Sequence, residues 1–125
     1  MTSFRLVSGA AVGAALAASA LSPAMAAECF LQRNINGFSA PNDRTVYVRV
    51  GVSDVWRLDL MNDCTGLSFR QSFGLQGSPT GPWICNPLDA TVRFHEAGAR
   101  MTCPVSAIHH LTKDEVAALP KRDRP

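Results

Sequence analysis

The sequence lacks the short motifs by which many enzymes are recognised. It has no G-x-S-x-G nucleophile turn, no H-E-x-x-H helix, no P-loop and no glycine fingerprint for a dinucleotide. It also has no C-x-x-C pair, and its three histidines are not spaced as ligands with the cysteines. These absences argue against a structural zinc site and against motif-dependent catalysis or cofactor binding. No catalytic residue, metal ligand or cofactor is therefore assigned.

The histidines and carboxylates do not form a recognisable site either. His109 and His110 are adjacent, so on a strand they would point to opposite faces and could not share a metal ion. His95 falls in a predicted turn, and all three are interpreted as surface histidines. Asp59 and Asp89 could act as an acid–base pair only if the fold brought them together. Otherwise each is expected to pair with a nearby arginine.

The chain also carries little net charge. Its formal net charge is +2, and losing Arg5 with the leader described below would leave +1. A charge this small does not indicate a nucleic acid or an anionic membrane as partner. No nucleic-acid partner is expected.

Only one long hydrophobic run is present, and it lies at the start of the chain. Arg5 precedes an uncharged apolar stretch over residues 6–21, and Ala24-Met25-Ala26 supplies the small-x-small pattern that a signal peptidase cleaves. The run is short for a membrane span, and Glu28 before Cys29 disfavours lipid attachment. Residues 1–26 are therefore predicted to be a signal peptide. The remaining residues 27–125 are predicted to form one periplasmic or secreted domain, with no membrane span after cleavage.

The domain after the predicted leader contains all four cysteines of the chain. An even number of cysteines in a small exported chain is typical of two disulfides. Sequence alone does not choose among the three possible connectivities of Cys29, Cys64, Cys85 and Cys103. We favour Cys29 with Cys64 and Cys85 with Cys103.

The strongest secondary-structure signal is a β-hairpin near the middle of the chain. Apolar and polar residues alternate over residues 45–50 and again over residues 55–60. Keeping both apolar sets on one face favours pairing Val50 with Asp54 across a loop of residues 51–53. In this register Tyr47 faces Arg57. The alternative pairing of Val50 with Trp56 would place two arginines opposite each other.

Further strands are predicted on either side of this hairpin. A first strand is expected over residues 30–35 with a turn at residues 36–37, and loops are expected at residues 39–43 and 76–82. A second hairpin is expected from the alternation of residues 88–94, a turn at residues 95–98 and a strand over residues 101–105. The pattern over residues 65–75 fits either a strand or irregular structure.

The end of the chain predicts a short helix. Thr112 and Glu115 can form a capping box, and Pro120 would end a helix over residues 113–119. Residues 121–125 are expected to be a frayed, solvated tail. Taken together, the patterns predict a mostly β protein, a small antiparallel, partly closed barrel or roll with one C-terminal helix and two disulfides.

Several separated segments of the chain resemble the bacterial DUF6491 family. The segments are residues 43–50 (DRTVYVRV), 56–60 (WRLDL), 83–85 (WIC) and 111–120 (LTKDEVAALP). The resemblance covers essentially the whole chain from Cys29 onward. It implies a small exported protein of proteobacteria, and it supplies no catalytic residue because the family is uncharacterised.

Arginines on the predicted strands are the main candidates for function. The set comprises Arg44, Arg49, Arg57, Arg70, Arg93 and Arg100. Of these, Arg49, Arg57 and Arg93, together with Tyr47, are predicted to form a binding face, because guanidinium groups pair with carboxylate and phosphate. An envelope protein or an anionic glycan is the expected partner, and the protein is interpreted as a non-enzymatic binding or structural module of the cell envelope. The alternative is a small periplasmic hydrolase or enzyme-inhibitor module whose site forms only in three dimensions.

Overall fold

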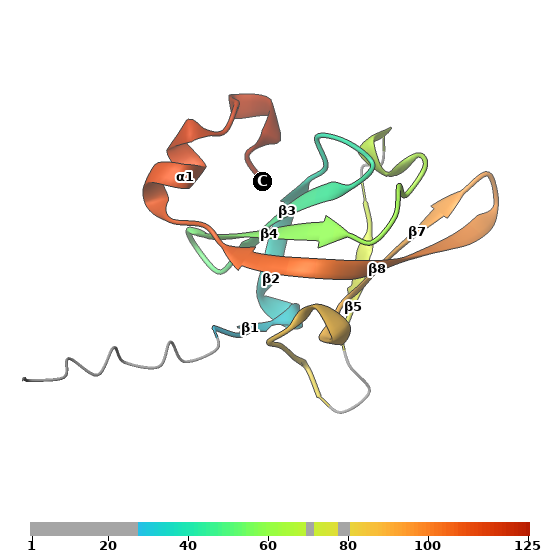
Figure 1. Cartoon of the computed structure of the whole chain (residues 1–125), viewed down its shortest axis with the longest axis horizontal. Coiled ribbons are helices and arrows are strands. Elements are labelled where there is room, and N and C mark those ends of the chain that lie inside the picture. The colour runs from blue at the N-terminus through green and yellow to red at the C-terminus, as the bar shows by residue number, and fades with distance from the viewer. Residues whose placement is uncertain (1–27, 70–71, 78–80) are drawn as a thin grey trace, which may run out of the picture.

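The computed structural model describes residues 28–69, 72–77 and 81–125. The predicted signal peptide, residues 1–26, lies outside the described residues. Among the described residues, no helix is long and apolar enough to cross a membrane. The chain forms β-strands, four short 3-10 helices and one α-helix over this part of the sequence (Figure 1).

Six antiparallel strands form one curled sheet. In sequence order they are β2 (Ile35–Ser39), β3 (Thr45–Val50), β4 (Asp54–Leu60), β5 (Gly74–Gln76), β7 (Thr91–Glu96) and β8 (Ala99–His110). Their order across the sheet is β2-β3-β4-β8-β7-β5, so β2 and β5 are the two edges. The sheet curls into a half-barrel, which confirms the predicted mostly β, partly closed barrel.

Side chains join the two edges of the half-barrel. The side-chain amide of Gln32, just before β2, donates to the carbonyl of Leu75 in β5, and the Gly77 amide donates to Gln32 Oε1 at 3.2 Å. Phe38 of β2 packs edge-on against Phe73, with ring centroids 4.3 Å apart. Gln32 thus satisfies one backbone group of β5 and one just after it, at an edge where a neighbouring strand would otherwise bond. The sheet is closed here by side chains instead of by a ladder.

The first hairpin has the predicted register. Val50 pairs with Asp54, Tyr47 with Arg57 and Thr45 with Asp59, which confirms the loop over residues 51–53. Gly51 in that loop has a φ of 66°, a conformation that glycine adopts without steric cost. The alternation that predicted these strands also builds the core, because every second residue points into the barrel. The residues of this hairpin that are buried inside the barrel are Val46, Val48, Val50, Trp56, Leu58 and Leu60. Val55 is also buried, but it lies on the other face of the sheet, opposite Arg49.

The predicted first strand is wrong in its extent. The chain instead forms β1 (Phe30–Leu31), the 3-10 helix η1 (Gln32–Asn34) and then β2, and the expected turn at residues 36–37 lies within β2. The pairing of β2 with β3 shifts register between Ile35 and Gly37. This irregularity accommodates Asn36 and Gly37 within the strand, so no turn forms there. β1 leaves the main sheet and pairs with β6 (Trp83–Ile84).

The second hairpin is also present, but its turn is shorter than predicted. β7 continues to Glu96 and pairs with β8 from Ala99, so the turn is Ala97-Gly98 and His95 lies in the strand. Ala97 and Gly98 both have positive φ, as a two-residue hairpin turn of the I′ type requires. Alanine rarely adopts this conformation, which is why the sequence did not indicate the turn there.

The start of the predicted second hairpin is a helical turn. Leu88 lies in the 3-10 helix η3 (Pro87–Asp89) and is 85% exposed. Asn86 accepts from the Leu88 amide, and Asp89 Oδ2 accepts from the amides of Asn86 and Cys85. These side-chain bonds compete with the ladder and delay the strand until Thr91.

The structure joins Cys29 to Cys85 and Cys64 to Cys103, so the favoured pairing of Cys29 with Cys64 and Cys85 with Cys103 is wrong. Phe30 pairs with Ile84 across β1 and β6, which sets the preceding Cys29 beside the following Cys85, with their Cα atoms 4.2 Å apart. Cys64 follows β4, and Met61 just before it donates to the carbonyl of Pro104 next to Cys103. Strand pairing between distant segments therefore determines both disulfides.

The C-terminal segment, residues 112–125, folds back onto the sheet. The helix α1 (Lys113–Ala118) has the predicted capping box, in which Thr112 accepts from the Glu115 amide and Glu115 from the Thr112 amide. The tail is exposed at Lys121, Arg122 and Arg124, as expected, but the expectation that it is frayed is wrong. Residues 121–123 form the 3-10 helix η4 (Lys121–Asp123), and Arg124 donates to the carbonyls of Leu119 and Ala117. Figure 1 shows α1 and the chain end on the side of β3 and β4.

Candidate functional site

The structure brings three of the four predicted binding-face residues together. Tyr47 lies directly opposite Arg57, and Arg49 lies two residues along β3 on the same face as Tyr47. Arg93 lies on β7, which is separated from β4 by β8. The predicted face is therefore divided into two places on the sheet.

Intramolecular partners already engage the guanidinium group of Arg49. Its Nε donates to Asn36 Oδ1 at 2.8 Å, and its Nη1 donates to the Pro125 carbonyl oxygen at 3.4 Å. Gly37 makes room for this arrangement, since a Cβ there would lie 3.3 Å from Arg49 Nη2 and 3.5 Å from the Pro125 carbonyl carbon. Arg49 thus holds the C-terminal segment against the sheet.

Arg57 is engaged by a carboxylate on its own strand. Its Nε and Nη2 donate to the two carboxylate oxygens of Asp59 at 2.8 and 3.1 Å, a bidentate pair. The hydrogen bond with Asp59 raises the pKa of Arg57 above its ordinary value. His109 Nε2 lies 3.6 Å from Asp59 Oδ2. The structure therefore places Asp59 with Arg57 and His109. Asp89 is the last residue of η3, where it bonds the amides of Cys85 and Asn86, so the two aspartates form no acid–base pair.

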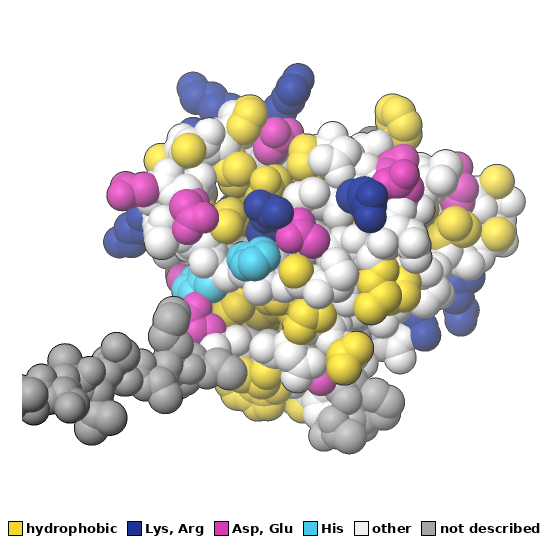
Figure 2. All heavy atoms as spheres, in the orientation of Figure 1, with side chains coloured by type: hydrophobic (Ala, Val, Ile, Leu, Met, Phe, Trp, Pro, Cys, Tyr) yellow, Lys and Arg dark blue, Asp and Glu magenta, His cyan; other side chains and the backbone are white. Residues whose placement is uncertain are grey.

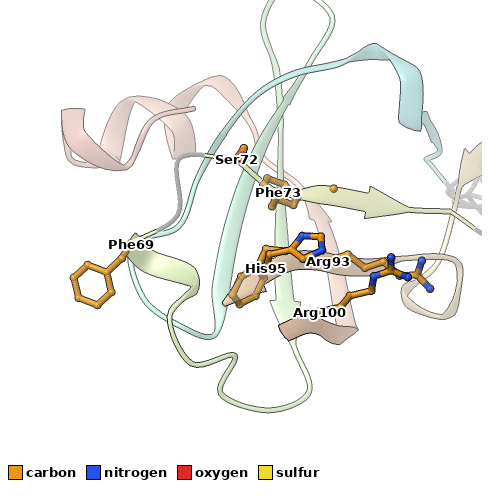
Figure 3. A pocket seen from close by; sticks show the side chains of 8 residues that line it. Phe69, Ser72, Phe73, Arg93, His95 and Arg100 are labelled. Carbon is orange, nitrogen blue, oxygen red and sulfur yellow. The ribbon is translucent and has the colours of Figure 1, made fainter. Parts of the chain in front are cut away.

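Arg93 and Arg100 lie together at the other end of the sheet. In the ladder of β7 and β8, Arg93 faces Thr102 and His95 faces Arg100. Arg93 and Arg100 are therefore diagonal neighbours on one face, at a separation that long side chains bridge. On its other side Arg93 faces Gly74 of β5, where no side chain covers it. In Figure 3 the two arginine side chains extend in the same direction.

A hollow of about 800 Å³ opens beside these two arginines. Its lining consists of Phe69, Ser72, Phe73, Gly74, Arg93, Phe94, His95 and Arg100 (Figure 3). Phe69, in the 3-10 helix η2 (Leu67–Phe69), is 86% exposed and points away from the arginines in this view. The lining therefore combines cationic and aromatic groups, and no carboxylate is among the lining residues.

The arginines of the described part of the chain differ in their partners. Arg44 Nε lies 3.6 Å from Asp63, Arg57 pairs with Asp59, and Arg122 Nε lies 3.7 Å from Asp123. Within the described residues, neither Arg93 nor Arg100 forms an ion pair with a carboxylate. Arg70, another arginine of the predicted set, lies outside the described residues. The hollow therefore brings together two arginines that have no carboxylate partner among the described residues.

Comparison with known proteins gives one match. The family of unknown function DUF6491 matches residues 2–125, essentially the whole chain. The chain belongs to this family. No curated protein and no solved structure matches it. The resemblance seen in the sequence is therefore confirmed, and it leaves the function to be argued from the geometry of this DUF6491 member.

Sequence reasoning missed most of the hollow. It included Arg93 in the predicted face but omitted His95 from it, because it placed that histidine in a turn. A two-residue turn at Ala97-Gly98 would have aligned His95 with Arg100 and Arg93 with Thr102. Gly98 is the residue from which this two-residue turn could have been predicted. Phe69 and Phe73 join the site through tertiary contacts, and no local pattern indicates them.

Tertiary contacts, not a sequence motif, determine the surroundings of His109 and His110. His109 and His110 occupy opposite faces of β8, as predicted. His109 approaches Asp59, and the exposed His110 stacks on Trp56. Figure 2 shows histidine side chains beside acidic groups on this face of the molecule. The described residues contain no group of three His, Cys, Asp or Glu side chains positioned for a metal ion.

Proposed function

We propose that this protein is a non-enzymatic binding module of the bacterial cell envelope that holds an anionic glycan in the hollow between η2, β5, β7 and β8. The observation that carries this proposal is the diagonal pair Arg93 and Arg100 on one sheet face, without a carboxylate partner in the described structure. Guanidinium groups form forked hydrogen bonds to carboxylate and sulfate oxygens. Two of them at neighbouring positions suit a ligand with repeated negative charges.

The aromatic residues of the hollow support the same class of ligand. Phe73 lines it together with the highly exposed Phe69, whereas Phe94 is 4% exposed and belongs to the core. Aromatic rings offer an apolar surface to the carbon skeleton of a ligand, while the arginines bind its charges. An anionic sugar chain has both properties.

The export of the protein to the periplasm is part of the proposal. The predicted signal peptide over residues 1–26 supports it, and so do the two disulfides, which fit an extracellular protein. A periplasmic location would place the hollow within reach of envelope glycans. We expect N-terminal sequencing or intact-mass measurement of the protein recovered from the periplasm to show a chain that begins at Ala27.

No specific observation favours the alternative of a hydrolase or enzyme inhibitor. Such a site would require a hollow that holds carboxylates or histidines with shifted pKa values. The two described residues whose pKa clearly departs from its ordinary value are Arg57 and Glu115, and neither lines a hollow. Binding, rather than acid–base chemistry, is the function that the geometry supports.

The test measures binding of heparin and polygalacturonate oligosaccharides at low ionic strength. Replacing Arg93 and Arg100 with alanine should raise the dissociation constant at least about tenfold, since each lost charge-assisted hydrogen bond contributes about 1.5 to 3 kcal/mol. The matched control replaces Arg44 and Arg122, which removes the same charge from exposed positions outside the hollow.

The comparison between these two variants decides the proposal. If it holds, the control variant retains binding, and added salt weakens binding of the unmodified protein. Equal losses in both variants would show attraction to net charge alone and would overturn a specific site. Unchanged binding after loss of Arg93 and Arg100 would also overturn it.

A further inference from the structure

Two glycines lie within the strands of the described sheet, and their surroundings differ. They are Gly37 in β2 and Gly74 in β5. A Cβ at Gly37 would lie 3.3 Å from Arg49 Nη2, so glycine there leaves room for a guanidinium group that holds the C-terminal segment. The presence of Gly37 thus follows from packing, whereas that of Gly74 needs another explanation.

Neither backbone conformation nor packing requires glycine at position 74. Its φ lies outside the positive range that favours glycine. Among the described residues other than its chain neighbours, a Cβ there would meet only the carbonyl oxygen of Arg93, at 3.9 Å, which is ordinary van der Waals contact. A glycine within a strand weakens it, because glycine loses more conformational freedom on folding and offers no side chain to pack. The strand alone would be more stable with another residue at this position.

Gly74 lies in the wall of the hollow that contains Arg93 and Arg100. It is exposed and directly opposite Arg93 across β5 and β7. Arg93 in turn faces Thr102 of β8, so the three residues form a row across one face of the sheet. Gly74 is the outer end of this row, because β5 is an edge strand. Figure 3 shows the strand that follows Phe73 running beside the strand that carries Arg93.

A side chain at position 74 would fill the space beside Arg93. Residues directly opposite each other on one face of a sheet have Cβ atoms about 4.5–5.5 Å apart. A branched side chain would therefore stand against the stem of Arg93 and narrow the approach to its guanidinium group from the sheet edge. Glycine inside a strand often marks a place where a ligand approaches the backbone closely. A strand glycine with no structural cause, in the wall of a cationic hollow, indicates such an approach.

We propose that Gly74 is a specificity-determining residue of the glycan site, where the bare backbone admits a sugar ring whose carboxylate or sulfate group binds Arg93. This inference rests on the proposed function of the hollow and adds the part of the ligand that the hollow selects. A sugar ring needs the width that glycine leaves over β5. A thin linear polyanion reaches Arg93 and Arg100 from solvent without crossing β5. The hollow therefore selects polyanions built of rings over linear ones.

The experiment compares two probes that carry the same charged group. Polygalacturonate oligosaccharides place carboxylates on sugar rings, and poly-L-glutamate oligomers of matched length place them on a flexible chain. Gly74→Val, in the full chain recovered after any natural processing, should raise the dissociation constant for polygalacturonate at least about tenfold, as overfilling a packed contact does. The same variant should bind poly-L-glutamate with a dissociation constant within about twofold of the unmodified protein.

The matched control is Gln76→Val. Gln76 is exposed, lies two residues along the same face of β5 and is not among the lining residues of the hollow. This variant should bind both probes as the unmodified protein does. Because valine is favoured in strands, both variants should unfold at the same or a higher denaturant concentration than the unmodified protein. Weaker binding by a protein of equal or greater stability cannot come from misfolding.

Each outcome supports or overturns the role of Gly74. Equal weakening of both probes in Gly74→Val, weakening of neither, or a lowered unfolding midpoint would overturn it. If the variant lacking Arg93 and Arg100 still loses polygalacturonate, the proposed function stands without this role. Failure of the unmodified protein to bind polygalacturonate would overturn both.

Discussion

Arginine side chains of this protein differ in function according to what each guanidinium group contacts. Arg57 is paired bidentately with Asp59, and Arg49 bonds Asn36 and the end of the chain. Their roles are therefore structural, whereas Arg93 and Arg100 face a hollow without a carboxylate. Residue type alone predicted a binding role for both groups. On the basis of these contacts we propose it only for the second group.

The backbone conformation at Gly66 can be tested by a single substitution. Gly66 has a φ of 87°, and a Cβ built there would approach the carboxylate of Glu96. We expect Gly66→Ala to lower the free energy of unfolding by about 1 kcal/mol or more, because alanine is strained at positive φ. Denaturant unfolding measures the change. Gly81→Ala is the control, because a Cβ at Gly81 would meet no atom within 4 Å among the described residues other than its chain neighbours, so alanine should be tolerated there. Equal losses in both variants would contradict the explanation.

At the scale of elements, local and tertiary bonds together define the C-terminal segment. The capping box of Thr112 and Glu115 starts α1, and Arg124 returns to bond the last carbonyls of the helix. The Leu111 amide donates to the carbonyl of Val55. Val55 pairs with Arg49 and so lies on the outer face of the sheet, yet it is only 4% exposed. The segment therefore covers the part of the sheet that the sequence predicted to be a binding face.

The capping box predicts a pH-dependent helix. Hydrogen bonds from the backbone and side chain of Thr112 lower the pKa of Glu115 below its ordinary value. A lowered folded-state pKa means that ionised Glu115 stabilises the helix. This stabilisation is complete above the ordinary glutamate pKa of about 4.3 and is lost as the pH falls through the lower folded value. Amide NMR shifts of α1 should follow this loss in acid.

The matched variants for this prediction differ in one carboxylate. Glu115→Gln should remove the acid-dependent change from α1, because the amide does not ionise in this range. Asp114→Asn should retain it, since Asp114 lies outside the box formed by Thr112 and Glu115. An acid transition that survives in Glu115→Gln would refute the proposed cause.

At the scale of the whole molecule, the two disulfides tie separate parts of the half-barrel together. Cys29–Cys85 joins the β1–β6 ribbon, and Cys64–Cys103 links the segment after β4 to β8. They close chain segments of 56 and 39 residues. Bridges over such distances restrict the unfolded chain considerably, and a domain of this size has a limited core.

Removing either disulfide should therefore destabilise the protein strongly. We expect the Cys29→Ala/Cys85→Ala and Cys64→Ala/Cys103→Ala pairs each to lower the free energy of unfolding by about 2 to 4 kcal/mol. Guanidinium unfolding measures both losses. Non-reducing peptide mapping should show Cys29 linked to Cys85 and Cys64 to Cys103, and a peptide linking Cys29 to Cys64 would contradict the fold.

The sequence by itself determined the elements whose cause is local. The alternation of valines around Tyr47 predicted the register of the first hairpin, and Thr112 with Glu115 predicted the start of α1. Both depend on residues a few positions apart, whose side-chain periodicity and backbone bonding are set before distant contacts form.

Only the tertiary structure decided which cysteines pair, where the C-terminal segment docks and which arginines face a hollow. Cys29 meets Cys85 because β1 leaves the main sheet to pair with β6, and Arg93 meets Arg100 because the turn at Ala97-Gly98 is two residues long. These contacts depend on how the sheet curls and on which strands become its edges. That choice is made by the packing of the whole core, and no single segment of the sequence contains it.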